Sequence, residues 1–296
     1  MKLLREAGIL LLLVVLVTTA VLVVDRTNGQ LVSSGETRRY LLHVPKNLDQ
    51  SETVPLVITI HGFAQWPANQ MAVSQWNTIA NREGFIVVYP SGTGFPKRWL
   101  AFPQQVFDSS KDVVFIADLI DALSAQYNID PARIYINGLS NGGGMTFLLG
   151  CELTDRIAAT GTVAGAFIMP IDQCAASHPM PVVAFHGTAD PIVPFHGGPS
   201  RGFDLPFPDV PQWMSARAEL NGCNPAPQAL PANGAVSGVR YSGCLEDAEV
   251  VFYTIDGGGH TWPGGHPLPE WIAGYTSMDI NASETMWAFF NQYTLP

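Results

Sequence analysis

The amino-acid sequence predicts an α/β fold in which helices cover both faces of a mostly parallel sheet. Short apolar segments with strand character alternate along the chain with longer segments of helical periodicity. Parallel strands need long crossover connections, which the intervening helices provide. Several of the short segments are apolar at every position, which is typical of strands buried on both faces.

Each element is delimited by its own signals. Strands are expected where short apolar runs end at Pro or Gly, and helices where apolar residues recur every three or four positions. The expected strands cover residues 38–45, 55–62, 85–90, 132–138, 158–165, 179–187 and 248–257, and the expected helices cover 71–84, 112–129, 141–153 and 283–294.

Two segments interrupt this alternation. Residues 91–111 and 194–213 are rich in Gly, Pro or aromatic side chains and show no periodicity, so we expect loops over the surface. The second is either a cover over a functional site or a plain insertion. Neither is long enough for a separate domain, so residues 31–296 are expected to form one domain.

The composition is that of a folded protein that avoids polyanions. The chain has 296 residues, of which 47% are hydrophobic and 14% charged, which is enough apolar surface for a sizeable core. Its formal net charge is −10, so nucleic-acid backbones and anionic lipid headgroups would repel it. Nucleic acid is therefore a poor candidate partner.

Residues 1–30 are expected to direct the chain to a membrane. Lys2 and Arg5 precede an uncharged apolar run at residues 8–24. The run is intermediate in length between a signal-peptide core and a full spanning helix, so a cleaved signal peptide and an uncleaved transmembrane anchor both remain open. In either case the remaining chain is exported, to the extracellular space, the periplasm or the outer face of the membrane.

The four cysteines agree with export. They are Cys151, Cys174, Cys223 and Cys244, and no Cys-x-x-Cys spacing suggests a zinc site or a redox dithiol. Two disulfides are the natural expectation in an oxidising compartment, and three connectivities are possible. We favour the local pairs, Cys151 with Cys174 and Cys223 with Cys244, because they close the shortest loops.

Residues 138–142 fit the pattern Gly-x-Ser-x-Gly around Ser140. A buried strand enters this stretch and a helix leaves it, a setting in which small flanking residues allow a sharp turn that exposes the serine hydroxyl. The turn also places Ser140 at a helix N-terminus, whose dipole favours negative charge. Ser140 is therefore the candidate nucleophile, the alternative being an ordinary serine that caps a glycine-rich helix.

A serine nucleophile needs a base and an acid that orients the base. In hydrolases with this kind of sheet, the acid follows a later strand and the histidine comes last in the chain. Asp190 follows a buried strand, and His260 lies in a glycine-dense loop after the last one, so the order Ser140, Asp190, His260 is met. We expect His186 to be structural, and Asp256 is the weaker alternative for the acid.

The oxyanion of a tetrahedral intermediate needs backbone N–H donors held in place. One is expected from Asn141, directly after the nucleophile. The other is expected from the loop after an early strand, where the amide of Phe63 in His61-Gly62-Phe63 is the best candidate, unless this is a plain strand-ending turn. This chemistry needs no metal and no organic cofactor.

Four stretches resemble the polyhydroxybutyrate depolymerase and feruloyl esterase family of secreted α/β-hydrolases: IHGFAQ, residues 112–145, FHGTADPIVPFHGG and DGGGHTWPGG. The resemblance covers residues 39–296 and implies an α/β-hydrolase fold. It implies a serine esterase acting on polymer or plant-cell-wall esters, with the three residues named above on the family's triad positions. The two local cysteine pairs also match the family.

The resemblance extends to substrate contacts. The HTWPGG signature suggests that Trp262 borders the substrate cleft, and Trp99 and Gln65 are further candidates. Many family members carry Cys-Thr after His-Gly, where this chain has Phe63 and Ala64, so the polarity of this loop is expected to differ. No substrate-adsorbing domain is expected, which favours soluble or small aromatic esters over crystalline polymer.

Two other functions stay open at this point. One is a serine peptidase on the same fold, and the other is a membrane-tethered binding or adhesion protein that kept the fold without turnover. A complete serine, histidine and aspartate set argues against the binding protein, because binding alone does not need it. The expected partner is thus an ester substrate, which could be polymeric, with membrane contact only through the N-terminal segment.

Overall fold

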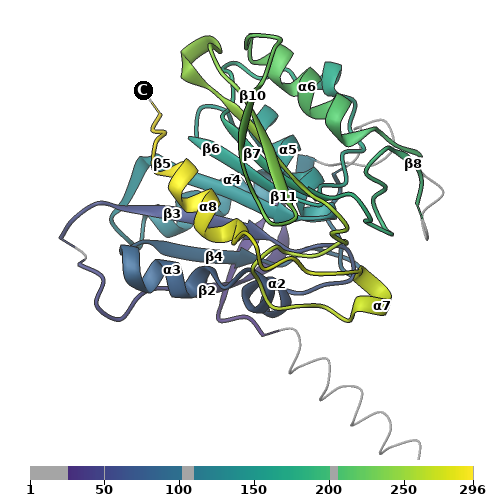
Figure 1. Ribbon diagram of the computed structural model, residues 1–296. Helices are drawn as coiled ribbons and strands as arrows, with labels where there is room; N and C mark the ends of the chain where they lie inside the picture. The colour runs from purple at the N-terminus through teal and green to yellow at the C-terminus, as the bar shows by residue number, and fades with distance from the viewer. Residues whose placement is uncertain (1–25, 50, 102–109, 201–205, 296) are drawn as a thin grey trace, which may run out of the picture.

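One large sheet organises the chain (Figure 1). The computed structural model describes residues 26–49, 51–101, 110–200 and 206–295. Among these residues, ten strands pair in the order β1-β2-β4-β3-β5-β6-β7-β12-β11-β10. In that order they are Gly29–Ser33, Glu36–His43, Ile86–Pro90, Val54–Ile60, Ile129–Leu139, Ala159–Val163, Val182–Gly187, Val250–Ile255, Val236–Tyr241 and Gln228–Asn233.

The six strands from β4 to β12 in this order are parallel to one another. β1 and β2 extend one edge as antiparallel strands, and β11 and β10 extend the other. This arrangement confirms the predicted mostly parallel sheet. The sequence analysis did not predict β1, β10 and β11, because these strands at or next to the sheet edges are partly exposed and lack a continuous apolar run.

Helices cover both faces because side chains along a strand point alternately to each face. In β3, Ile58 packs into one core and Val57 into the other. The first core is covered by α4 (Ser110–Ser124), α5 (Asn141–Glu152) and α6 (Val210–Leu220), and the second by α2 (Pro67–Ser74), α3 (Trp76–Glu83) and α8 (Ala282–Phe290). The central strands are therefore apolar on both faces, which is the pattern that predicted them.

The single helix predicted at residues 71–84 is wrong, because the segment forms the end of α2 and all of α3. Gln75 separates them in a left-handed conformation with φ 56°. Its N–H donates the last backbone hydrogen bond of α2, to the Met71 carbonyl. The break turns the chain so that Trp76 is fully buried and its Nε1 donates to Asn137 Oδ1 over 3.1 Å. Tertiary packing thus overrides a continuous helical pattern.

The aperiodic segment predicted at residues 194–213 is only partly a loop. It contains the short pair β8 (Gly198–Pro199) and β9 (Pro206–Phe207), and its last residues begin α6. Asp209 caps that helix by accepting the N–H of Gln212 over 2.9 Å. The sequence analysis predicted no helix here, because Pro and aromatic residues conceal the period of α6.

Both predicted disulfides are present. Cys151 at the end of α5 bonds Cys174, which follows a short 3₁₀ turn, and Cys223 after α6 bonds Cys244 after β11. Each therefore ties the end of a helix to a nearby loop, and the four cysteines are all paired.

The apolar run at residues 8–24 lies outside the described residues. Within the described part of the chain, no helix is long and apolar enough to span a bilayer.

Candidate active site

Ser140 occupies a sharp turn between β5 and α5. β5 ends at Leu139 and α5 begins at Asn141, and Ser140 between them has φ 57° and ψ −120°. A non-glycine residue rarely adopts this conformation, which costs about 1–3 kcal/mol and persists only where the surroundings impose it. Here Ser140 N–H bonds the Val163 carbonyl of β6, and the Ser140 carbonyl accepts from Gly144 in α5.

The glycines around Ser140 are required by close backbone contacts. A Cβ on Gly142 would overlap the Ile60 carbonyl at the end of β3, and a Cβ on Gly138 would overlap the Gly142 carbonyl. These two glycines let α5 start directly against the carboxyl ends of the strands. The Gly-x-Ser-x-Gly pattern is thus a steric requirement of the turn.

Asp190 and His260 meet at the carboxyl ends of two adjacent parallel strands. Asp190 follows β7 and His260 follows β12, and His260 Nδ1 lies 2.8 Å from Asp190 Oδ2. The other carboxylate oxygen, Oδ1, accepts the N–H groups of Ile192 and Val193, each over 2.8 Å. Two amides and one imidazole therefore fix the orientation of the carboxylate.

The surroundings of Asp190 keep it ionised. Burial by itself raises the pKa of this carboxyl, but the lowering effects, led by the charge and hydrogen bond of His260, together outweigh burial and hold the pKa below its usual value. His186 and the Val193 amide act in the same direction. His186 Nε2 lies 3.4 Å from Asp190 Oδ2 and 2.9 Å from the Val193 carbonyl, and burial lowers the pKa of His186.

Ser140 and His260 line one cavity, which we call the His260 cavity. Gly62, Gln65 and Leu268 also border it, and it encloses about 570 Å³ including its open mouth. Within the described residues, the Ser140 hydroxyl makes no hydrogen bond to the imidazole; the two groups share the cavity instead. Such bonds are often long without substrate and shorten when it binds.

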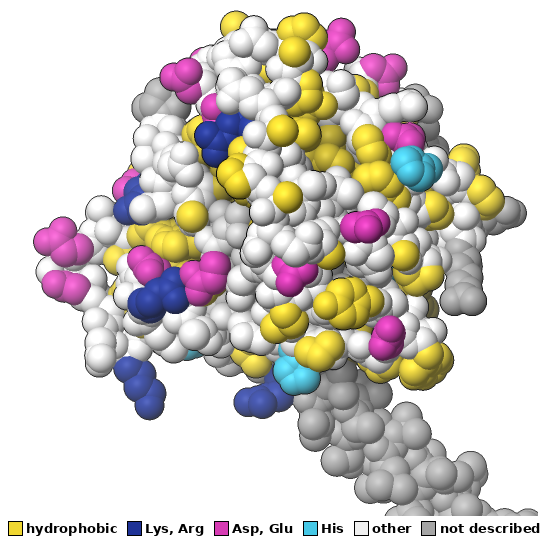
Figure 2. Space-filling model, in the orientation of Figure 1, with side chains coloured by type: hydrophobic (Ala, Val, Ile, Leu, Met, Phe, Trp, Pro, Cys, Tyr) yellow, Lys and Arg dark blue, Asp and Glu magenta, His cyan; other side chains and the backbone are white. Residues whose placement is uncertain are grey.

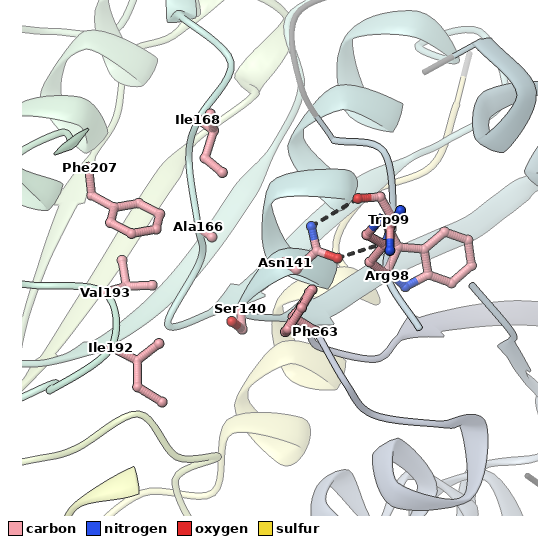
Figure 3. Close-up of a pocket in the computed structure, with 10 residues that line it drawn as sticks. All are labelled: Phe63, Arg98, Trp99, Ser140, Asn141, Ala166, Ile168, Ile192, Val193 and Phe207. Atoms are coloured by element: carbon pink, nitrogen blue, oxygen red, sulfur yellow. Dashed lines mark hydrogen bonds between the residues drawn. The ribbon is translucent and has the colours of Figure 1, made fainter. Parts of the chain in front are cut away.

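A second pocket also borders Ser140, and we call it the Phe207 pocket (Figure 3). It shares Phe63 and Ile192 with the His260 cavity. Figure 3 shows Ser140 between its two walls. One wall is formed by Ala166, Ile168, Ile192, Val193 and Phe207, and the other by Phe63, Arg98, Trp99 and Asn141. The pocket encloses about 500 Å³ including its mouth and is mainly apolar, with Arg98 as its charged member.

Hydrogen bonds hold the loop that carries Gly62 and Phe63. His61 Nε2 accepts the Gly92 N–H over 3.0 Å, so its Nδ1 carries the proton and donates to the Gly62 carbonyl over 2.8 Å. The Gly62 N–H donates to Gln65 Oε1 over 3.0 Å. Both peptide groups of Gly62 are therefore fixed, which orients the Phe63 amide that follows.

The side chain of Asn141 ties the helix start to the same region. Its Oδ1 accepts the Trp99 N–H over 2.7 Å, and its Nδ2 donates to the Trp99 carbonyl over 3.1 Å (Figure 3). Trp99 Nε1 in turn donates to the His61 carbonyl over 3.1 Å. The backbone N–H of Asn141 belongs to the first turn of α5, where N–H groups have no acceptor within the helix.

Comparison with known proteins places the chain in a family. The profile of the family described as Esterase PHB depolymerase matches residues 39–197, more than half of the chain. The chain belongs to this family. It is therefore an esterase, a hydrolase of carboxylic esters.

Individual relatives of the esterase differ in length and substrate. Feruloyl esterase B of Piromyces equi is 30% identical over 232 residues, which are 75% of this chain and 42% of that protein. Poly(3-hydroxyalkanoate) depolymerase C of Paucimonas lemoignei is 26% identical over 245 residues, 75% of this chain and 58% of that protein. The esterase thus spans about half the length of these two relatives.

A solved structure supports the fold of the esterase. Acetyl xylan esterase from Aspergillus awamori superimposes with a TM-score of 0.64 at 16% identity, over 89% of this chain and 98% of that one. At this identity the similarity establishes the shared fold. The central parallel sheet and its helices on both faces are therefore those of the α/β-hydrolases.

Trp262 does not border the cleft of the esterase, which corrects the sequence prediction. Its side chain is 1% exposed and packs in the core beneath α8, where Nε1 donates to Ser283 Oγ over 3.0 Å.

Trp99 borders the Phe207 pocket, but its ring is also fully buried. Gln65 lines the His260 cavity with its Oε1 already bonded to Gly62. Asp256 is exposed and accepts from Thr188 instead of His260.

Sequence reasoning missed the residues that shape the Phe207 pocket. Ile168 and Ile192 come from two loops and Phe207 from the short strand β9. Ile192 lies in a stretch that resembles the family, but nothing in that stretch marks it as a pocket residue. The structural role of His61 was also missed, although His-Gly at a strand end was a usable signal. Among the described residues, no group of His, Cys, Asp and Glu side chains could hold a metal ion.

His61 makes a specific prediction for stability against pH. Burial lowers the pKa of His61 to about 4, whereas the unfolded chain binds this proton near pH 6.5. The unfolded state therefore binds more protons between these values, so stability is full above pH 6.5 and is lost as the pH falls toward 4. We expect the free energy of unfolding to drop by about 3 kcal/mol from this group between pH 7 and pH 4.

Urea unfolding of the protein at pH 7 and at pH 4 measures this effect. The His61→Asn variant should lose less stability on acidification than the wild type, by roughly the same 3 kcal/mol. The exposed His266→Asn variant serves as the matched control. An equal loss in wild type and His61→Asn would contradict the assignment.

Proposed function

We propose that the esterase acts through an acyl-enzyme formed on Ser140. In this proposal, His260 Nε2 takes the proton of the Ser140 hydroxyl while Oγ attacks the ester carbonyl carbon. Asp190 keeps the other imidazole proton on Nδ1 and stabilises the imidazolium. The observation that carries the proposal is the 2.8 Å contact between His260 and Asp190 in a cavity that Ser140 also lines.

The amides of Phe63 and Asn141 are the proposed donors to the oxyanion. Asn141 N–H lies at the start of α5, where the helix dipole adds positive potential. The Phe63 amide follows Gly62, whose peptide groups are fixed by His61 and Gln65. Collapse of the tetrahedral intermediate breaks the bond to the alcohol oxygen, which takes the proton from His260. Water then repeats the sequence and releases the acid.

This mechanism assigns one part of the ester substrate to each of the two hollows beside Ser140. The leaving alcohol must approach the imidazole that protonates it, so it occupies the His260 cavity. The acyl group then occupies the second hollow beside Ser140, the Phe207 pocket. An apolar pocket favours an uncharged acyl group such as acetyl, feruloyl or short hydroxyalkanoyl, the classes named by the relatives.

We further propose that the esterase works outside the cytoplasm on plant-polymer or polyhydroxyalkanoate-type esters. Two disulfides favour an oxidising compartment, and the apolar run at residues 8–24 favours export. The negative net charge of −10 favours neutral substrates over anionic ones.

Covalent labelling tests the acyl-enzyme directly. A fluorophosphonate probe should attach to one serine, and peptide mass mapping should find it on residues 138–145 containing Ser140. A kinetic panel of methyl ferulate, p-nitrophenyl acetate, hydroxybutyrate oligomers and a peptide amide then ranks the substrates. Labelling elsewhere, or turnover of the peptide amide but of no ester, would contradict the proposal.

A further inference from the structure

An exposed apolar segment follows the loop that carries His260. Trp271, Ile272, Tyr275 and Met278 are four of the ten large hydrophobic side chains that are exposed in the described chain. Trp271 lies in α7 (Glu270–Ala273) and is 81% exposed. Figure 2 shows hydrophobic side chains gathered on the lower right of the molecule, where Figure 1 places α7. Large exposed apolar patches on soluble proteins mark interaction sites.

Backbone hydrogen bonds fix this segment to the loop of His260. The His260 N–H donates to the Ala273 carbonyl, and the Gly259 N–H donates to the Tyr275 carbonyl. Ile272 and Ala273 border the His260 cavity, as does Leu268 just before α7. Trp271 thus directly precedes two residues that line this cavity, in a short helix held by the backbone of the His260 loop.

A large leaving alcohol in the His260 cavity meets this helix, because Ile272 and Ala273 line that cavity. The inference rests on the proposed function, in which the alcohol oxygen lies beside His260 in the His260 cavity. The part of the substrate beyond that oxygen then leaves through the mouth bordered by α7. We propose that Trp271 is a binding platform for a sugar ring on the alcohol side of the ester.

The chemistry around Trp271 favours a sugar over a polyester chain. A sugar has an apolar C–H face that stacks on an indole and hydroxyl groups that donate hydrogen bonds. Glu270, exposed and next to Trp271, has a carboxylate that can only accept them. A polyester chain offers carbonyl acceptors, which Glu270 cannot satisfy. Residues 254–296, which include α7 and the loop of His260, contain no Lys or Arg.

Two acetyl esters with different alcohols test the platform. Acetylated xylo-oligosaccharides place a sugar at the mouth, whereas p-nitrophenyl acetate ends within the cavity. In Trp271→Ala, we expect the ratio of kcat/KM for the sugar ester to that for p-nitrophenyl acetate to fall about tenfold, through KM. Trp271→Phe should restore most of the ratio, because an aromatic face remains. Leu245→Ala removes another exposed hydrophobic residue that borders neither cavity and should keep the wild-type ratio.

Each contrary outcome has a distinct meaning. An unchanged ratio in Trp271→Ala, or a larger loss on hydroxybutyrate oligomers than on the sugar ester, would overturn the sugar platform. Absence of Ser140-dependent turnover in the wild type would instead overturn the proposed function. In that case an NMR titration with unesterified xylo-oligosaccharide decides on the platform: shifts of an indole signal that is lost in Trp271→Ala support it, and no shift refutes it.

Discussion

Replacing Ser140 by alanine is expected to lower kcat for ester hydrolysis by about 10⁶-fold, since nucleophile, base and acid act as one unit. Alanine keeps the Cβ and the backbone of the turn but removes Oγ, so no acyl-enzyme can form. The remaining activity, from the oxyanion donors and substrate binding alone, should stay above the rate in water. Initial rates on p-nitrophenyl acetate with purified wild type and variant measure the loss.

A second variant at the same position separates chemistry from folding. Ser140 has φ 57° and ψ −120°, a conformation that glycine adopts without strain. Ser140→Gly should therefore be as inactive as Ser140→Ala but at least as stable, although glycine elsewhere usually costs about 0.5–1 kcal/mol relative to alanine. Thermal unfolding of both variants tests this order. Activity retained in Ser140→Ala would remove Ser140 from the mechanism.

The sequence predicts much of this site because parallel strands bring distant residues to one edge of the sheet. Ser140, Asp190 and His260 each follow a different buried strand, and the carboxyl ends of parallel strands lie on the same edge. An apolar strand followed by Gly or a polar turn is readable from local sequence. The steric demands of the turn are readable too, since they require Gly138 and Gly142.

Features set by tertiary contact could not be read in this way. Trp262 lies two residues after His260 and was expected at the cleft, yet its side chain points into the core and meets Ser283. Trp271, which no motif marks, is an exposed tryptophan beside the His260 cavity instead. The direction of a side chain in an irregular loop depends on what packs against it, and neither composition nor spacing records that contact.

Replacing Asp190 by asparagine is expected to lower kcat/KM by about 10⁴-fold, because it puts the imidazole proton on the wrong nitrogen. The Ile192 and Val193 N–H groups both point at Oδ1, so an asparagine must present its carbonyl oxygen to them. Its NH₂ group then faces His260 Nδ1 and donates to it. The single proton of the neutral imidazole moves to Nε2, which can no longer accept the serine proton.

Asp256→Asn is the matched control for this prediction. Asp256 lies just after β12, a few residues before His260, but it is exposed and bonds Thr188. We expect its kcat/KM to stay within about twofold of wild type, as for a surface substitution. ¹⁵N NMR of the His260 ring should show the proton on Nδ1 in the wild type and on Nε2 in Asp190→Asn. The same tautomer in both proteins, or an equal loss of activity in both variants, would show that orientation of the imidazole by Asp190 is not the source of the effect.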